Sequence, residues 1–138
     1  MMLSRKPILL VGGEGKEGSF ARLALNEAGL GEDIVQSATA PEALNYLRGC
    51  YTERPRVVLL DVGNVDREGL DTLRAIKGDE ELRSIPVVVF GPSDDRRTVD
   101  ESFDLGAAGY MGTSVDPAAF TWALRTVCEY WSLSELPK

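Results

Sequence analysis

Short apolar segments alternate with longer segments of mixed polarity along the chain. Five apolar segments recur about every 25 residues, a spacing typical of strand and helix units. They are Pro7–Val11, Ile34–Ala38, Val57–Leu60, Val87–Phe90 and Tyr110–Met111. The third and fourth consist of apolar side chains only, which is typical of strands covered by helices on both faces. The pattern therefore predicts alternating strands and helices in an α/β domain.

The segments between the predicted strands carry residues that start and stop helices. Thr39 and Glu42 have the spacing of a capping box, with a proline in the first turn between them. Residues 93–95 suit the start of the fourth helix, and 116–117 suit the start of the fifth. Glycines are expected to end the first four helices near Gly29, Gly49, Gly78 and Gly106.

Five strand and helix units predict a doubly wound, flavodoxin-like parallel sheet of the (βα)5 type, with strand order 2-1-3-4-5. We expect residues 1–138 to form a single domain, with a core in 7–131 and a C-terminal tail in 132–138. Binding sites in such sheets lie beyond the carboxyl ends of the strands. The candidate site is therefore built from four loops, at 12–15, 61–64, 91–93 and 112–114.

The charge of the chain argues against two classes of partner. Its 15 Lys and Arg against 22 Asp and Glu give a formal net charge of −7, which disfavours nucleic acid and anionic membranes. No apolar segment has the length of a membrane span or of a signal-peptide core. We therefore expect a cytoplasmic protein whose partners are neither nucleic acid nor membrane.

The chain also lacks the residues of several kinds of catalytic and metal site. It contains no histidine, and its two cysteines, Cys50 and Cys128, are far apart in sequence. This composition excludes histidine-dependent nucleophilic catalysis and leaves zinc without a ligand set. We expect both cysteines to be reduced residues that serve in packing.

Asp61 directly follows the third apolar segment and so lies at the mouth of the candidate site. Other segments share the relative spacing of a known family: Ile8–Val11, Gly69-Leu70, Ser84–Val89 and Leu105–Tyr110. Together with Asp61 they resemble a response-regulator receiver domain of two-component signalling. The resemblance implies a signalling protein, not an enzyme, with Asp61 at the position that accepts a phosphoryl group from a sensor histidine kinase.

The family surrounds its aspartate with two acidic metal ligands, a hydroxyl and a lysine, because an acyl phosphate forms only where its charge is offset. In this sequence the four positions hold, in the same order, Gly12, Gly13, Gly91 and Thr113. The resemblance therefore implies a phosphorelay protein whose own phosphorylation site is degenerate, a pseudo-receiver that uses no cofactor. Tyr110 holds the family's switch-aromatic position, but the hydroxyl that would move it is missing.

Two other interpretations stay open. Glu14 offers one carboxylate beside the lost acidic pair, and with it Asp61 would be a working phosphoacceptor that depends on Mg²⁺. The run Gly13-x-Gly15-x-x-Gly18 matches a dinucleotide-binding fingerprint after a predicted strand. That fingerprint needs an acidic residue at the end of the second strand, where this chain has Gln36–Ala38.

The last predicted helix carries apolar side chains on two faces. Its core face holds Phe120, Leu124, Val127, Cys128 and Trp131. Trp122 projects to the opposite side. The apolar tail resembles that of single-domain receivers that accompany bacterial phytochromes, which implies a homodimer beside contacts with a sensor histidine kinase or another signalling protein. The interface candidates are Trp122, Tyr130, Trp131, Leu133 and Leu136, although Trp131 and Leu133 would equally suit closure of the core.

Overall fold

The computed structural model describes residues 6–12, 16–27, 29–49, 54–63, 68–92, 95–112 and 117–133. Its strands are β1 (Ile8–Val11), β2 (Ile34–Ser37), β3 (Val57–Asp61), β4 (Val87–Gly91) and β5 (Gly109–Gly112). Its helices are α1 (Lys16–Glu27), α2 (Ala40–Gly49), α3 (Glu68–Gly78), α4 (Arg96–Asp104) and α5 (Pro117–Leu133). A 3₁₀ turn, η1 (Gly31–Asp33), precedes β2 and was not predicted from the sequence.

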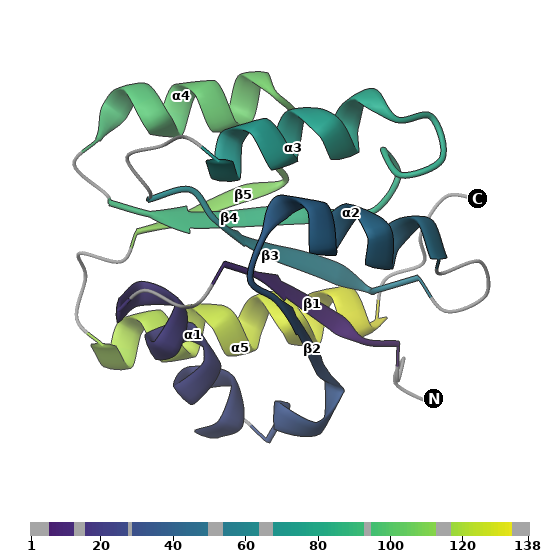
Figure 1. Ribbon diagram of the computed structural model, residues 1–138. Helices are drawn as coiled ribbons and strands as arrows, with labels where there is room; N and C mark the ends of the chain where they lie inside the picture. The colour runs from purple at the N-terminus through teal and green to yellow at the C-terminus, as the bar shows by residue number, and fades with distance from the viewer. Residues whose placement is uncertain are drawn as a thin grey trace.

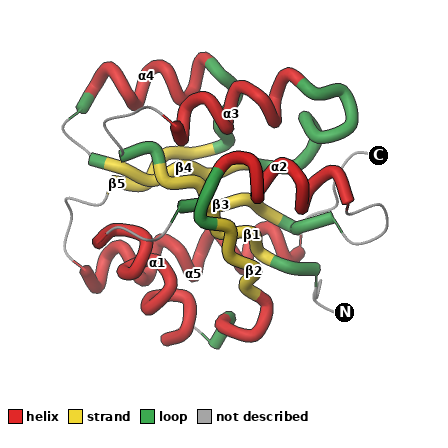
Figure 2. The backbone as a smooth tube through the Cα atoms, in the orientation of Figure 1, coloured by secondary structure: helices red, strands yellow, loops and turns green. Residues whose placement is uncertain are grey.

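The strands form one parallel sheet in the order β2-β1-β3-β4-β5, which confirms the predicted doubly wound fold. Figures 1 and 2 show α1 and α5 on one face of this sheet and α2, α3 and α4 on the other. Because the strands all run in one direction, their carboxyl ends share one edge of the sheet. β3 is the central strand, so its last residue, Asp61, lies in the middle of that edge.

Alternate residues of each strand face the two layers of helices, as the pleat of a strand requires. On the α2 and α3 face the buried strand residues include Leu9, Val58, Leu60, Val87 and Val89. On the α1 and α5 face they include Ile8, Leu10, Val57, Leu59 and Phe90. Burial of apolar surface, at about 25 cal/mol per Å², is what holds the helices on both faces.

Thr39 caps the start of α2 as predicted, whereas the Glu42 carboxylate accepts from the amide of Ala38, one residue before the partner that a capping box would use. The Glu42 amide donates a 3.3 Å hydrogen bond to Thr39 Oγ1, and the Ala38 amide donates a 3.0 Å hydrogen bond to Glu42 Oε2. At α4 the cap is Asp95, whose carboxylate accepts hydrogen bonds from the amide and hydroxyl of Thr98. These hydrogen bonds hold the pKa of Asp95 below its usual value.

A buried ion pair, which the sequence did not indicate, joins the starts of β2 and β3. Asp33 ends η1 and Arg56 directly precedes β3, so the pair reaches across β1 at the amino edge of the sheet. Arg56 Nη2 lies 2.8 Å from Asp33 Oδ2, and only 3% of the Arg56 side chain is exposed. A charge this deeply buried is stable only with a partner of opposite charge.

Lys77 ties α3 to the turn that leads into β4. Its Nζ donates hydrogen bonds of 3.0 Å and 2.8 Å to the carbonyl oxygens of Arg83 and Ile85. The side chain is half-buried, and this burial lowers the pKa of Lys77 from its usual value. The residue therefore works as a connector between backbone segments.

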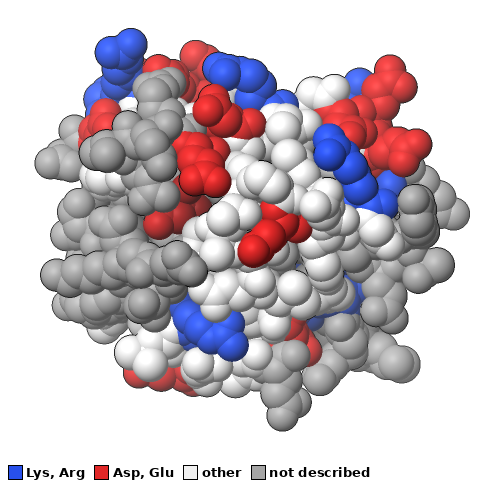
Figure 3. All heavy atoms as spheres, viewed as in Figure 1, with Lys and Arg blue, Asp and Glu red and all other residues white. Residues whose placement is uncertain are grey.

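The charged side chains are unevenly spread over the surface. Figure 3 shows acidic and basic residues mixed along the upper part of one face, over α4 and the end of α3, above a largely uncharged middle. On α4 they form exposed pairs, Arg96 with Asp100 and Arg97 with Glu101. None of the helices in the described part of the chain is both long enough and apolar enough to cross a membrane.

Candidate functional site

Asp61 lies at the carboxyl edge of the sheet, where the sequence placed the candidate site. The residue is 5% exposed. The Gly63 amide donates a 2.8 Å hydrogen bond to Asp61 Oδ1, so the chain turns tightly around the carboxylate just after the strand. The carboxylate is thus held inside the turn and does not extend into solvent.

Gly12 packs against Asp61 so closely that no side chain fits at this position. Its φ is +94°, in the left-handed region that favours glycine. A Cβ atom at Gly12 would lie 2.9 Å from the Cβ of Asp61. The Gly12 amide donates a 2.9 Å hydrogen bond to the Ser37 carbonyl, which fixes this backbone conformation. An aspartate at position 12 would therefore be strained and would collide with Asp61.

The hydroxyl group of Tyr110 fills the space beside Gly91. A Cβ at Gly91 would lie 2.8 Å from Tyr110 Oη and 3.2 Å from Val62 Cγ2. Tyr110 Oη donates a 2.8 Å hydrogen bond to the Pro92 carbonyl. Although β5 is an edge strand, the tyrosine ring therefore reaches inward, over the end of β4.

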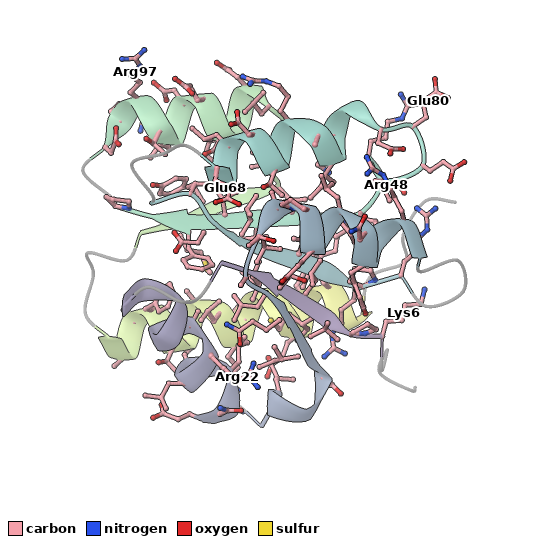
Figure 4. All side chains as sticks on the ribbon, in the orientation of Figure 1. Lys6, Arg22, Arg48, Glu68, Glu80 and Arg97 are labelled. Atoms are coloured by element: carbon pink, nitrogen blue, oxygen red, sulfur yellow. The ribbon has the colours of Figure 1, made fainter. Side chains whose placement is uncertain are left out.

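Glu68 connects the helices that flank Asp61. The Ala40 amide, at the start of α2, donates a 3.0 Å hydrogen bond to Glu68 Oε1, at the start of α3. Figure 4 shows the Glu68 side chain in this position between the two helices. The negative charge is favourable at the amino end of a helix. Thr72 Oγ1 in turn donates a 2.8 Å hydrogen bond to the Glu68 carbonyl.

A small cavity lies between Asp61 and these two helices. Its volume is about 20 Å³, and Asp61, Glu68 and Thr72 are among the residues that line it. A cavity of this size and polarity has room for a single water molecule. It has no room for a nucleotide or for another organic ligand.

The described residues do not fit the ligand set of a divalent cation. Mg²⁺ requires near-octahedral oxygen ligands with one or two carboxylates, and the family takes two of them from the loop after the first strand. Gly12 has no side chain to offer, and Glu68 is engaged by α2. Within the described ranges, no group of three or more Asp, Glu, Cys or His residues lies close enough to hold a metal ion.

Several predicted site residues lie outside the described residues. They include Gly13, Glu14, Gly15, Cys50, Ser93, Thr113, Ser114 and Leu136. Leu133 ends α5, but its side chain is also outside the described part. The improvised metal ligand at Glu14 and the dinucleotide-binding run therefore stay hypotheses from the sequence.

The described interface candidates divide into two groups. Trp122 is 69% exposed and Tyr130 is 61% exposed. Trp131 is partly buried and packs against the core on the α1 and α5 face, as the alternative interpretation predicted. The rings of Tyr130 and Trp131 meet edge to face, with 4.7 Å between their centroids.

Sequence reasoning missed a polar chain that connects α1 to Gly12. Arg22 Nη1 donates a 2.7 Å hydrogen bond to Gln36 Oε1, and Gln36 Nε2 donates a long one, 3.5 Å, to the Gly12 carbonyl. Figure 4 shows Arg22 on the face of the sheet opposite to Glu68. The one sequence feature that could have indicated this polar chain was Gln36 itself, a polar residue near the end of a strand beside the candidate loop.

Comparisons with known proteins place this arrangement among response regulators. No model of a protein family matches the sequence. The chain is 32% identical over 130 residues to the probable methanogenesis regulatory protein FilR2 of Methanothrix harundinacea, which covers 90% of this chain and 82% of FilR2. It is 27% identical over 113 residues to the response regulator Rcp1 of Synechocystis, which covers 79% of this chain and 77% of Rcp1.

Solved structures agree with the sequence comparison. The phosphorylated cyanobacterial phytochrome response regulator RcpA superposes with a TM-score of 0.78 at 28% identity, over 96% of this chain and 99% of RcpA. The Mn²⁺-bound form of Rcp1 superposes with a TM-score of 0.76 at 25% identity, again over 96% of this chain and 99% of the other. The similarity therefore extends over the whole sheet and its helices.

Proposed function

The chain belongs to the response-regulator receiver family of two-component signalling, and from this premise we propose that it signals without phosphorylation of Asp61. In this proposal it is a receiver with a degenerate site. Its output is a surface that other signalling proteins contact, and it catalyses no reaction of its own.

The observation that carries the proposal is the packing of Gly12 on Asp61. Transfer of a phosphoryl group to a carboxylate brings negative charges together, and metal ligands and cations must offset them. Each such electrostatic contact typically contributes about 2.7–4 kcal/mol to a transition state. At Gly12 the backbone at φ +94° and the 2.9 Å approach to Asp61 exclude the first acidic ligand. An acidic side chain introduced at position 12 would therefore not restore this metal ligand.

The position of Tyr110 supports the same proposal. The resemblance implies that the aromatic residue of the family moves inward when a neighbouring hydroxyl moves toward the phosphoryl group. Here the Tyr110 hydroxyl already occupies the place next to Gly91 and is hydrogen-bonded to the Pro92 carbonyl. In this proposal the surface around β5 needs no phosphoryl group to set its shape.

The relatives define the alternative that an experiment must exclude. RcpA has been crystallised in a phosphorylated state, and Rcp1 has been crystallised with Mn²⁺. If this chain retained the same chemistry, with Glu14 as an improvised ligand, Asp61 would accept a phosphoryl group from a small donor in the presence of Mg²⁺.

Intact-mass spectrometry after incubation with acetyl phosphate and Mg²⁺ tests the proposal. We expect no phosphorylated species, while RcpA treated in parallel serves as the positive control. Beryllofluoride with Mg²⁺ should likewise leave the tyrosine and tryptophan fluorescence unchanged. Stoichiometric phosphorylation within minutes that is lost in Asp61→Asn would overturn the proposal and establish a working phosphoacceptor.

The proposed partners are proteins. The net charge of −7 disfavours nucleic acid and anionic membranes, and exposed aromatic side chains on α5 favour protein contacts. We place a second copy of the chain among these partners, together with a sensor histidine kinase or another signalling protein. Because no phosphoryl group is needed, self-association should be indifferent to Mg²⁺ and to phosphodonor.

A further inference from the structure

A groove lies at the amino edge of the sheet, opposite to the edge that holds Asp61. It lies between the end of α2 and the turn that follows α3, and its volume is about 500 Å³. Its two apolar lining residues, Leu47 and Leu82, are each 2% exposed and form its floor. The other described lining residues are all charged: Arg48, Arg54, Asp79, Glu80 and Glu81. A groove of this size suits a short peptide segment that carries both charges and an apolar side chain.

The two signs of charge come from different elements. Arg48 Nε lies 3.8 Å from Asp79 Oδ2, and because the side chains are 57% and 28% exposed, solvent screens this contact. Arg54 Nη1 donates a hydrogen bond to the Glu81 carbonyl. A guanidinium group has five N–H donors, so this one bond does not exhaust Arg54. Figure 4 shows Arg48 and Glu80 at the same end of the molecule. The basic side of the groove can therefore bind a further carboxylate.

The acidic turn at residues 79–81 is held by its own hydrogen bonds. The Asp79 carbonyl accepts hydrogen bonds of 3.1 Å and 2.9 Å from the amides of Leu82 and Arg83. The Asp79 carboxylate accepts a third, of 2.9 Å, from the Glu81 amide. This wall of the groove is thus formed before anything binds, and the entropy cost of binding falls mainly on the bound segment.

The last helix ends close to this groove. In an α/β sheet the helices run opposite to the strands, so α2, α3 and α5 all end at the amino edge. Figure 1 shows the yellow end of α5 on the side of the molecule where α2 ends. Burial raises the pKa of the Cys128 thiol and the charge of Arg56 lowers it, so this charge lies near the last turns of α5. Arg56 follows the groove residue Arg54 by two positions.

The residues that follow α5 match the chemistry of the groove. Residues 134–138, here called the tail segment, have the sequence Ser-Glu-Leu-Pro-Lys and lie outside the described residues. The segment carries one acidic, one apolar and one basic side chain, in that order. The groove offers two guanidinium groups, a leucine floor and an acidic turn. The segment adds no net charge, so it can approach a protein of net charge −7 without overall repulsion.

We propose that the tail segment binds in this groove of its own molecule. Glu135 then meets Arg54, Leu136 lies on the leucine floor, and Lys138 meets the acidic turn. Packed layers lie about 10 Å apart, so Arg54, which precedes β3, is one layer from α5. Five extended residues span up to about 17 Å, enough to pass the edge of the sheet. The order of side chains along the segment therefore matches the order in which it meets the groove.

Pro137 favours this arrangement over a longer α5. A proline disfavours the helical conformation of the residue before it, here Leu136, and favours an extended one. The ring also restricts the conformations that the free segment can adopt. The segment therefore loses less conformational entropy when it binds in an extended form.

Binding in the groove withholds the tail segment from other proteins. Leu136 is then buried against its own molecule, and a partner that uses this side chain must first release it. The apparent affinity of such a partner is reduced in proportion to the fraction of molecules with a released tail. Because the groove lies at the edge opposite to Asp61, this contact needs no phosphoryl group.

Disulfide trapping in the full chain tests the placement. In a Cys50→Ser background, Leu136→Cys is combined with Arg48→Cys, and cysteine keeps a small apolar side chain over the floor. Arg97→Cys with Leu136→Cys is the matched control, because Arg97 is also an exposed arginine in an ion pair and lies at the opposite end of the molecule in Figure 4. Cys128 does not compete, because its buried thiol has a pKa raised to about 12.

The measured quantity is the effective concentration of the two thiols in glutathione redox buffers. We expect it to be at least about tenfold higher for the pair with Arg48→Cys than for the pair with Arg97→Cys. Mass spectrometry after proteolysis identifies the disulfide as intramolecular. Equal effective concentrations for the two pairs would overturn the proposal.

Charge variants of the tail segment test its register in the groove. In the trapping pair, Lys138→Glu should lower the effective concentration at least about threefold, because it brings a carboxylate to the acidic turn, whereas Lys138→Arg should leave it unchanged. Glu135→Arg should lower it as well, and the addition of Arg54→Glu should restore part of the loss. Circular dichroism checks that each variant is folded. An unchanged value in Lys138→Glu would overturn the contact with the acidic turn.

The two proposals of this article fail separately. Equal trapping of the two cysteine pairs overturns the binding of the tail segment and leaves the proposal about Asp61 untouched. Phosphorylation of Asp61 by acetyl phosphate overturns the proposed function, whereas the groove is judged by the cysteine pairs and the Lys138 variants alone.

Discussion

Gly91 is a residue whose missing side chain is replaced by the hydroxyl of a neighbour. A Cβ at this position would lie 2.8 Å from Tyr110 Oη, so Gly91→Ala should cost about 1–3 kcal/mol of unfolding free energy. In a Tyr110→Phe background the colliding oxygen is absent, and the cost of Gly91→Ala should fall. Urea denaturation of the four proteins in a double-mutant cycle measures this coupling. Equal costs in the two backgrounds would contradict the contact.

Cys128 shows how burial controls reactivity at the residue scale. The pKa of its thiol is raised to about 12, mainly by burial. Arg56 lowers this pKa and Glu129 raises it, and both effects are smaller than that of burial. Because the thiolate is the reactive form, a Cys50→Ser variant should not react with Ellman's reagent at pH 8 until it is unfolded.

The same shift has a pH consequence. The folded state keeps the proton of Cys128 up to about pH 12, whereas the unfolded chain loses it near its ordinary value of 9.0. The unfolded state therefore binds fewer protons between these values, and the contribution of Cys128 to stability falls as pH rises through this window. Stability curves of Cys50→Ser with and without Cys128→Ala, between pH 8 and pH 10.5, should converge as the pH rises. A constant difference would contradict the raised pKa.

At the scale of elements, the docking of α3 on β3 depends on Gly69. A Cβ at this position would overlap the backbone oxygen of Asp61 and lie 2.9 Å from Val62 Cα, so neither neighbour can yield without moving the strand end. We expect Gly69→Ala to cost about 3 kcal/mol of unfolding free energy and to shift the loop after Asp61. Gly78, in the same helix, has open space around it and is the matched control.

The control variant should behave oppositely. Gly78→Ala should be neutral or stabilising by up to about 1 kcal/mol, because alanine favours the helix and meets no neighbour. Thermal and urea unfolding of both variants measure the difference. Comparable losses at the two positions would show that the contact with Asp61 does not set the cost at Gly69.

Local signals made most elements predictable from the sequence. The wholly apolar runs Val57–Leu60 and Val87–Phe90 are typical of strands covered on both faces, and they form β3 and β4. The cap of α2 by Thr39 was predictable because the residues involved, Ala38 to Glu42, lie within five positions of one another. The 3₁₀ turn η1 was missed because its Gly-Glu-Asp sequence carries no periodic signal in three residues.

Contacts between side chains that are far apart in the chain could not be predicted from the sequence. Asp33 and Arg56 are 23 residues apart, and each alone looks like a solvated charge. Likewise the pattern placed Asp61, Gly12, Gly91 and Tyr110 at one edge of the sheet, since parallel strands bring their carboxyl ends together. It did not indicate that the tyrosine hydroxyl fills the space at Gly91, because that depends on a side-chain conformation set by β4 and β5 together.

On the scale of the whole molecule, the carboxyl edge of the sheet is closely packed, whereas α5 exposes large aromatic side chains. At the edge, Gly12 packs against Asp61, and the cavity that these two residues help to line has a volume of about 20 Å³. On α5, exposed aromatic residues lie on a locally neutral face of an acidic protein. Figure 1 shows α5 lying along the lower face of the sheet, so a partner can reach it without displacing the loops at the edge. The contacts proposed at α5 would therefore be separable from the chemistry of Asp61.

The net charge predicts how salt affects the proposed dimer. Two molecules of charge −7 repel each other. With centres about 36 Å apart, the size expected for this chain length, the repulsion is about 2 kcal/mol at 0.01 M salt and negligible at 0.15 M, because the Debye length falls from about 30 Å to about 8 Å. Solvent-exposed ion pairs between two copies would contribute only about 0.2–1 kcal/mol each and would lose part of that when screened. The loss of repulsion between the whole molecules is therefore the larger effect of salt. The dissociation constant of the dimer should fall about tenfold as NaCl rises from 0.01 M to 0.15 M. Sedimentation equilibrium at the two salt concentrations measures this change. A dimer that weakens with added salt would mean that ion pairs between the two copies, and not the exposed aromatic side chains of α5, hold them together.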